Sequence, residues 1–167
     1  MSHAAIMSRW VICFTFAIAV AGKLGSLRSY KEFSESLDAW FGRNLPKSVR
    51  TTLAGAVITA ELAVVALTAF DGSAIIGLLL AIALLLSFTL AMVIAVRMGR
   101  QIVCNCFGRG AQDVSTVHFV RNGIILIISG VGAVGADLGT SSVLPIVLAL
   151  VIGLAISRIE DIGYLIR

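Results

Sequence analysis

Long apolar runs separated by short polar segments make up most of the sequence. Four runs cover residues 10–22, 51–70, 74–96 and 117–136, and a shorter fifth run covers residues 143–156. A transmembrane helix needs about 20 mostly apolar residues, and in lipid only helices or closed barrels satisfy their own backbone polar groups. The pattern predicts an all-α fold, an integral membrane helical bundle of four to five transmembrane helices, with residues 1–167 forming a single domain.

The first run allows two interpretations. Residues 10–22 follow Arg9 and contain Ala19-Val20-Ala21 near their end, an arrangement that resembles a secretory signal peptide with its cleavage site. We interpret the run instead as the first span, extended back to Ile6 while the side chain of Arg9 snorkels outward to the headgroups.

The later runs constrain how the helices pack. The turn Asp71-Gly72-Ser73 is so short that the spans on either side of it must be antiparallel neighbours. Residues 143–156 reach across a bilayer only if Ser157 and Arg158 are drawn in, so four spans with a re-entrant or surface segment are the alternative. Small residues in the fourth run predict close helix packing in lipid. These residues are Gly123, Gly130, Gly132 and Gly135.

Residues 25–50 have a different pattern. Apolar positions recur every three or four residues opposite a charged side, which is typical of an amphipathic helix lying in the plane of the headgroups. Ser26 is the candidate N-cap, and the helix must end before Pro46. The segment either covers the end of the bundle or offers a docking surface to a partner enzyme. Its apolar residues are Tyr30, Phe33, Leu37, Trp40 and Phe41, and its charged ones are Lys31, Glu32, Glu35 and Asp38.

The composition supports a membrane protein and indicates what the net positive charge does. Hydrophobic residues make up 59% of the chain, charged residues only 13%, and the net charge is +4. In a membrane protein an excess of Lys and Arg sets orientation, so we expect contact with membrane lipid and none with nucleic acid. With five spans, nearly all basic residues fall on one side. The positive-inside rule then predicts a multi-pass protein of the cell membrane, with the loop of Cys104 and Cys106 in the cytoplasm.

A polar island at residues 97–110 holds the two most reactive side chains, Cys104 and Cys106. A Cys-x-Cys pair can close only a small, strained disulfide ring, and strain makes a disulfide easier to reduce, so the pair is typical of redox exchange. Arg100 and Arg109 should favour the thiolate, which is the nucleophilic form. We predict that Cys104 and Cys106 are catalytic.

Two alternatives stay open for these thiols. Cys-x-Cys also occurs in metal-binding loops, but a zinc site needs two more ligands and His118 is the only nearby candidate, so we predict no metal site. The pair could also be chemically inert. Cys13, alone within the first span, is expected to be a packing residue and not a resolving partner.

The apolar runs and their ends contain four ionisable residues that we take as cofactor-binding candidates. Glu61 lies within the second run, where a carboxyl group costs roughly 3 kcal/mol to insert and is functional by default. It could handle protons or hold the head of a lipid-soluble cofactor, or it could simply bond a neighbouring helix or pair with Lys23. Lys23 ends the first span, where it could equally be an interfacial anchor. His118 and Arg121 open the fourth span and should face the same aqueous boundary as the thiols.

Several of these features occur in a recognisable order. They are Ala21-Gly22-Lys23-Leu24, Glu61, Cys104-Asn105-Cys106-Phe107-Gly108 and Arg121-Asn122. Over roughly residues 8–156 the chain resembles the family of the methylamine utilisation protein MauE, within the wider DoxX-like group of small membrane proteins. The resemblance implies a bundle concerned with thiol redox. MauE is associated with maturation of methylamine dehydrogenase, whose small subunit is rich in disulfides, and DoxX-like relatives with quinone-coupled oxidation of sulfur or thiols.

The sequence thus leads to one hypothesis and two alternatives. The chain is a membrane thiol:disulfide oxidoreductase component in the maturation or redox of a partner protein. Cys104 and Cys106 exchange with a thiol-containing protein or a small thiol, and electrons pass to the quinone that the resemblance implies, bound near the cofactor-binding candidates. The alternatives are a non-catalytic assembly subunit that docks a partner enzyme on residues 25–50, and a carrier for a metal ion or small thiol.

Overall fold

Helices form almost all of the described structure. The computed structural model describes residues 3–41, 46–99, 103–104, 112–113, 116–134, 149 and 151–156. The helices are α1 (His3–Leu24), α2 (Leu27–Phe41), α3 (Lys47–Ala69), the short 3-10 helix η1 (Asp71–Ser73), α4 (Ala74–Arg97) and α5 (Thr116–Val134). The two-residue strands β1 (Val103–Cys104) and β2 (Gln112–Asp113) pair antiparallel. The predicted all-α bundle is confirmed.

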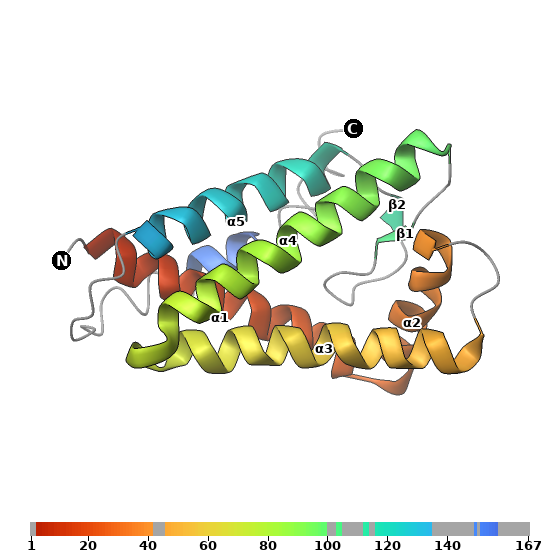
Figure 1. The fold of residues 1–167 in the computed structure, drawn as a ribbon, viewed down its shortest axis with the longest axis horizontal. Helices are drawn as coiled ribbons and strands as arrows, with labels where there is room; N and C mark the ends of the chain where they lie inside the picture. Colours follow the sequence, from red (N-terminus) through yellow and green to blue (C-terminus); the bar gives the residue numbers. More distant parts are fainter. Residues whose placement is uncertain are drawn as a thin grey trace.

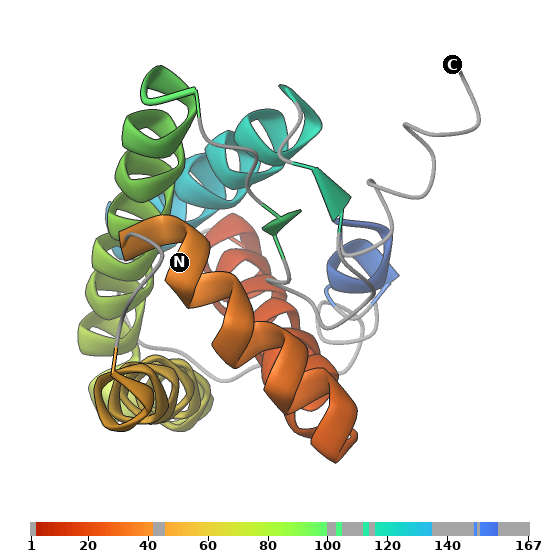
Figure 2. The ribbon, with the colours of Figure 1, turned by 90° about the vertical axis from the view of Figure 1, so that its right-hand side faces the viewer.

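Four long helices form the bundle, and α2 covers one of its ends. α1 packs against α3 and α5, and α4 packs against the same two helices (Figure 1). Seen from the covered end, α2 lies across the bundle with β1 and β2 beside it (Figure 2). Because β1 contacts α2, the backbone of Cys104 lies at this end too.

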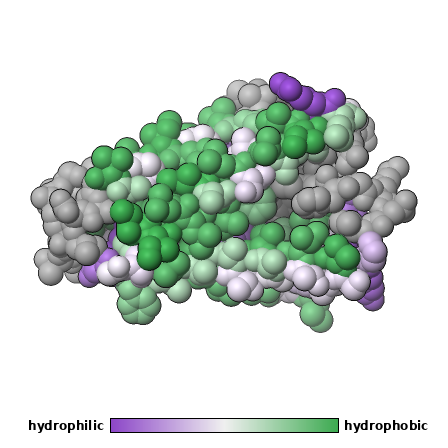
Figure 3. Space-filling view, in the orientation of Figure 1, coloured by the Kyte–Doolittle hydropathy of each residue, from purple (hydrophilic) through white to green (hydrophobic). Residues whose placement is uncertain are grey.

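The long helices have the length and surface of membrane spans. Within the described residues, four segments are long and apolar enough to cross a bilayer: Ala5–Leu24, Lys47–Ala69, Asp71–Arg97 and Val117–Val134. Apolar side chains cover the visible face along its length, while hydrophilic ones gather at the ends (Figure 3). Soluble monomers rarely expose so large an apolar surface, whereas a lipid-facing bundle must. The prediction of a multi-pass membrane protein is confirmed.

The core between the long helices is built from one to three buried apolar residues of each. Ile12 of α1, Val64 of α3, Leu78 of α4 and Ile125 of α5 are almost completely buried. Ala149 and Ile156 join the same core from the carboxyl-terminal part of the chain, where residues 151–156 are helical. The rest of the predicted fifth span lies outside the described residues.

The apolar side of α2 packs on α3. Phe33 and Leu37 are buried against Ala54 and Ile58, because α2 folds back over the start of α3. We expected α2 either to cover the end of the bundle or to offer a docking surface, with its aromatic side turned toward the membrane. It does cover the end of the bundle, and Phe33 and Leu37 are buried against α3. Packing on another helix removes more apolar area of α2 from water than contact with the hydrated headgroup region would.

The ends of α2 follow the sequence closely. The hydroxyl of Ser26 accepts a hydrogen bond from the backbone N–H of Ser29 at 3.0 Å, so the predicted N-cap is confirmed. Pro46 directly precedes α3, as its fixed φ and missing N–H allow. An ion pair between Arg50 and Asp38, with 2.5 Å between Nη1 and Oδ2, ties α2 to the start of α3.

Close packing by glycine occurs at one of the positions that we predicted and at one that we did not predict. A Cβ on Gly132 would lie 3.1 Å from Leu78 Cδ1 and Ser8 Cβ, so this glycine does allow a close approach. A Cβ on Gly123 or Gly130 would meet no atom of another described helix within 4 Å, and Gly135 lies outside the described residues. The tightest such contact between two long helices is at Gly77. A Cβ there would lie 2.8 Å from the backbone N of Thr68, which explains how α3 and α4 form so tight a hairpin.

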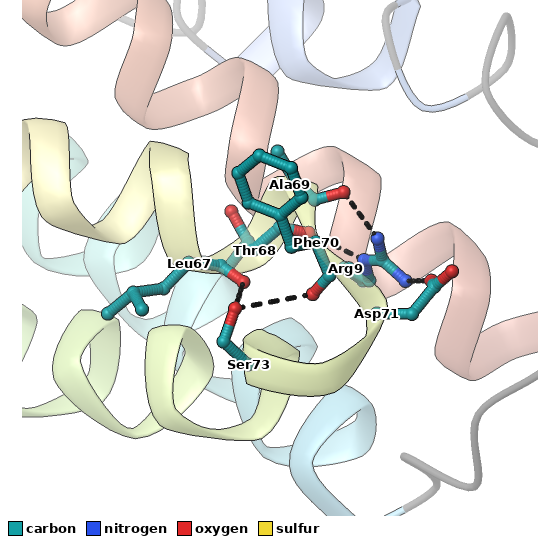
Figure 4. Close-up of polar contacts among 7 residues, drawn as sticks. All are labelled: Arg9, Leu67, Thr68, Ala69, Phe70, Asp71 and Ser73. Atoms are coloured by element: carbon teal, nitrogen blue, oxygen red, sulfur yellow. Dashed lines mark hydrogen bonds and ion pairs between the residues drawn. The ribbon is translucent and has the colours of Figure 1, made fainter.

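Arg9 points into the protein, so our expectation that it snorkels outward is wrong. Its guanidinium donates hydrogen bonds to the carbonyls of Thr68 at 2.5 Å and Ala69 at 2.7 Å, and pairs with the carboxylate of Asp71 (Figure 4). The last carbonyls of a helix lack partners within it, and a guanidinium offers five donors. Arg9 is therefore 8% exposed and holds the C-terminal end of α3 against α1.

Candidate functional site

A buried ion pair between α1 and α3 is the centre of the site. Lys23 Nζ donates to both carboxylate oxygens of Glu61, at 2.6 Å and 2.8 Å. The side chains of Lys23 and Glu61 are 1% and 3% exposed. Of the alternatives for these two residues, pairing is confirmed, and an interfacial anchor at Lys23 is wrong. The reason is geometric, because helix side chains point back toward the N-terminus and carry the ammonium group of Lys23 into the bundle.

α2 closes the outer side of this ion pair. The Phe33 ring lies over the ammonium group of Lys23, with 5.1 Å from Nζ to the ring centroid. The face of an aromatic ring carries partial negative charge and attracts a cation. The apolar side of α2 therefore packs on α3 and also shields the Lys23–Glu61 pair from the end of the bundle.

Glu61 also lines a cavity between the long helices. The cavity has a volume of about 30 Å³, enough for one or two water molecules. Its polar wall consists of Thr15 of α1, Glu61 of α3, and Arg121 and Asn122 of α5. The rest of the wall is apolar, made by Phe16, Ala19, Leu85, Phe88 and Ile125. A carboxylate, a guanidinium, an amide and a hydroxyl thus meet in one small space inside the bundle.

The inward face of α5 brings its polar residues to this cavity. His118 and Arg121 are each 1% exposed, so our expectation that they face an aqueous boundary is wrong. They begin a helix face that packs against α1 and α4, and this face is buried from its first turn. Its buried residues are His118, Arg121, Asn122, Ile125 and Ser129, spaced three and four apart.

Hydrogen bonds fix the polar residues of α5 to α4. Arg121 Nη2 donates to Asn122 Oδ1 at 3.3 Å, and Asn122 Nδ2 donates to the hydroxyl of Thr89 at 3.2 Å. Thr89 in turn donates to the carbonyl of Leu85 at 2.7 Å. Polar side chains within a membrane bundle are bonded across helices in this way because lipid offers them no partner.

Thr15 and Asn122 were missed as site residues by the sequence reasoning. Thr15 is 2% exposed, and its Oγ1 has no hydrogen-bond partner among the described residues. Both residues are polar and lie within or at the start of an apolar run, which is the same signal that singled out Glu61. The rule that polar residues within spans face the bundle interior would have found them had we applied it to neutral groups.

The four cofactor-binding candidates lie close together, while the thiols of the cysteine island are not described. Lys23 bonds Glu61, Glu61 and Arg121 line one cavity, and His118 lies one turn before Arg121. In β1 and β2, Cys104 is paired with Gln112. Cys106 and the side chain of Cys104 lie outside the described residues, and so does the predicted disulfide.

Cys13, the third cysteine, is buried as we expected of a packing residue. It is 6% exposed, and its Sγ lies 3.7 Å from the carbonyl oxygen of Val65 as a weak donor. Its place within α1 separates it from the covered end of the bundle.

Comparison with known families decides the relationship of the chain. A family described as methylamine utilisation protein MauE matches residues 1–135. The chain belongs to the MauE family. The match with MauE takes in all five named α-helices as far as Val134, and with them the Lys23–Glu61 pair and the cysteine island, but not residues 149–156. No curated protein and no solved structure matches the chain.

Proposed function

We propose that this MauE-family protein is a membrane thiol:disulfide oxidoreductase component that acts in the maturation or redox of a partner protein. The observation that carries the proposal is the buried Lys23–Glu61 pair beside a polar cavity, near the end of the bundle where β1 contacts α2. Ionisable groups are expensive inside a membrane bundle and usually mark a functional path. The backbone of Cys104, in β1, lies at the same end as this path.

The chemistry uses the cysteine pair as the exchanging group. A partner protein or small thiol attacks the Cys104–Cys106 disulfide and leaves with its own thiols oxidised, and the pair becomes a dithiol. Reoxidation of the pair releases two electrons and two protons. A quinone accepts both and becomes a quinol, so atoms and electrons balance.

The polar cavity is the site that we propose for the headgroup of the quinone. Arg121 and Thr15 are hydrogen-bond donors suited to a carbonyl oxygen, and Phe16 and Phe88 are flat apolar neighbours. At about 30 Å³ the cavity has room for water but not for a ring, so headgroup binding requires the helices to part. We choose a quinone as the electron acceptor because the protein lies in a membrane and because related families are linked to quinones.

The first experiment follows the redox state of the two thiols in membranes. Thiol labelling before and after addition of a quinone should show Cys104 and Cys106 turning from dithiol to disulfide. Cys104→Ser and Cys106→Ser should each abolish the change, and Cys13→Ser should leave it intact because Cys13 is buried within α1. A pair that stays reduced with quinone and with soluble disulfides would refute the oxidoreductase proposal.

Thiol labelling from each side of the membrane tests in which compartment the reaction takes place. A membrane-impermeant thiol reagent should label Cys104 and Cys106 only from the cytoplasmic side, in accord with the positive-inside rule. Labelling from the outside alone would move the partner to the other compartment and overturn the predicted orientation.

A docking role is the second candidate, and the outer side of α2 favours it. Lys31 and Glu35 are exposed there and form an i,i+4 pair with 3.9 Å between Nζ and Oε1. Phe33 is a poor site for testing docking because it is buried against α3 and Lys23. Charge reversal at Lys31 and Glu35, with intact thiol exchange, should instead abolish capture of the partner enzyme. Normal capture by the reversed variants would rule out docking through this surface.

A further inference from the structure

The Lys23–Glu61 pair connects the covered end of the bundle to its interior. Lys23 is the last residue but one of α1, and the three residues that follow it, Leu24 to Ser26, are exposed. The backbone of Lys23 therefore lies at the polar end of the helix. Its side chain runs back into the bundle, where the residue is 1% exposed.

Glu61 faces this lysine on one side and the cavity on the other. Its oxygens accept hydrogen bonds from Lys23 Nζ at 2.6 Å and 2.8 Å. The same side chain lines the cavity that has room for one or two water molecules. The cavity wall also includes the Thr15 hydroxyl, a buried polar group without a hydrogen-bond partner among the described residues. A proton on Glu61 thus has two neighbours, the amine of Lys23 and the contents of the cavity.

We propose that Lys23 and Glu61 transfer protons between the covered end of the bundle and the cavity. In the first step an N–H bond of the Lys23 ammonium breaks as an O–H bond forms on Glu61, leaving a neutral amine and a carboxylic acid. Glu61 then gives the proton to water or to a reduced acceptor in the cavity. Lys23 takes a new proton from water at the end of the bundle when the Phe33 ring, which covers its ammonium group, moves aside, and this step restores the ion pair. Burial makes the neutral pair accessible because it disfavours the charged forms of both groups.

The surrounding groups make the neutral pair transient. The two hydrogen bonds from Lys23 favour the carboxylate of Glu61. Arg121, from α5, lines the same cavity, and His118 lies one turn before it. From α2, the Phe33 ring favours the ammonium form of Lys23. α4 contributes apolar side chains to the cavity wall. The ion pair is therefore the resting state, and the protonated carboxyl forms only while a proton passes.

Lysine-to-arginine substitution separates proton transfer from simple pairing. Arginine keeps a positive charge opposite Glu61 but does not lose its proton in proteins. Lys23→Arg should slow quinone-dependent oxidation of Cys104 and Cys106 by about 100-fold, the usual contribution of a positioned acid or base. Oxidation by a soluble disulfide, which needs no proton path through the bundle, should stay within about 2-fold of the unmodified protein. A normal quinone-dependent rate in Lys23→Arg would overturn the proposal.

An infrared measurement tests the pair without using the cysteines. The pairing and transfer of a proton do not depend on thiol chemistry, although the reduced acceptor rests on the function proposed above. On acidification the purified protein should develop a carboxylic acid band that Glu61→Gln removes. Exchange of its hydrogen for deuterium should be at least about 10-fold slower in Lys23→Arg, because the route through the amine is closed. Absence of such a band, or unchanged exchange, would refute the role of the pair.

The Arg50–Asp38 pair provides a matched control. It also joins two helices, but its side chains are 24% and 27% exposed and do not line the cavity. Asp38→Asn should change neither the infrared exchange nor the quinone-dependent rate. If the thiols prove inert while the Glu61 band and its slowed exchange in Lys23→Arg are observed, only the oxidoreductase proposal is refuted. The two proposals can therefore be tested independently.

Discussion

Two buried cations near the two ends of α1 are held in different ways. Arg9 donates to two backbone carbonyls at the end of α3 and pairs with Asp71, a side chain that is 62% exposed. Lys23 is held by a carboxylate that is itself 3% exposed, and the pair adjoins a cavity. The partners of Arg9 come mostly from the backbone, and the partner of Lys23 is a single ionisable side chain.

The contrast separates a cation with a structural role, Arg9, from Lys23, for which we propose a role in proton transfer. Carbonyls at a helix C-terminus exist in any helical hairpin and attract a cation without a second buried charge. A buried ion pair contributes little net stability, because removing two charges from water offsets their attraction. The Arg9 cluster therefore needs no purpose beyond holding α1 to α3. The Lys23–Glu61 pair is expected to add little net stability, which is consistent with the role in proton transfer that we propose for it.

The largest expected effect is at Glu61. Glu61→Ala leaves the Lys23 ammonium buried without its carboxylate and should lower the free energy of unfolding by about 4 kcal/mol. Thermal unfolding in detergent, followed by circular dichroism, measures the loss. In the double variant Lys23→Met with Glu61→Leu the stability should return to within about 1 kcal/mol of the unmodified protein. If the double variant is as unstable as Glu61→Ala, the pair has a structural role, and Lys23 does not differ from Arg9 in the way that we propose.

Removal of Arg9 should have the second largest effect. Arg9→Ala takes away the donors to the carbonyls of Thr68 and Ala69 and should cost about 2 to 3 kcal/mol, as for hydrogen bonds from a charged group. Quinone-dependent oxidation of the thiols, measured at a temperature where the variant is folded, should be unaffected. Loss of this activity in folded Arg9→Ala would show that both ends of α1 contribute to function.

Sequence reasoning predicted the helices better than the direction of their charged side chains. The spans, the tight turn at Asp71–Ser73 and the cap at Ser26 follow from local chemistry, and the structure has them. Arg9, Lys23 and His118 were expected near an aqueous boundary because each lies toward the end of a span. Their burial depends on which carbonyls, carboxylates and rings the neighbouring helices bring to them, and spacing along one helix does not contain that information. The chemistry of Cys104 and Cys106 stays a prediction.

A smaller effect on stability is expected at Gly77, which lies against the end of α3 that Arg9 holds. The Cβ of Gly77→Ala would lie 2.8 Å from the backbone N of Thr68, the residue whose carbonyl Arg9 holds. Overpacking of this kind costs about 1 to 3 kcal/mol, and here it should also loosen the end of α3. Gly55→Ala is the matched control, since its Cβ would meet no atom of another described element within 4 Å, and it should stabilise α3 by about 0.5 to 1 kcal/mol. Equal effects at the two glycines would mean that the α3–α4 hairpin is not tightly packed.

The smallest effect on the free energy of unfolding is expected at Asp71. This variant tests the comparison between Arg9 and Lys23 most directly. Asp71→Asn removes the carboxylate beside Arg9, just as Glu61→Ala removes the one beside Lys23. Because Asp71 is 62% exposed and Arg9 keeps both carbonyls, the loss should be below about 1 kcal/mol. Unfolding of both variants in the same detergent gives the two losses side by side. A loss at Asp71 as large as that at Glu61 would show that Arg9 depends on its carboxylate as Lys23 does, and the backbone carbonyls would then not explain why Arg9 is buried.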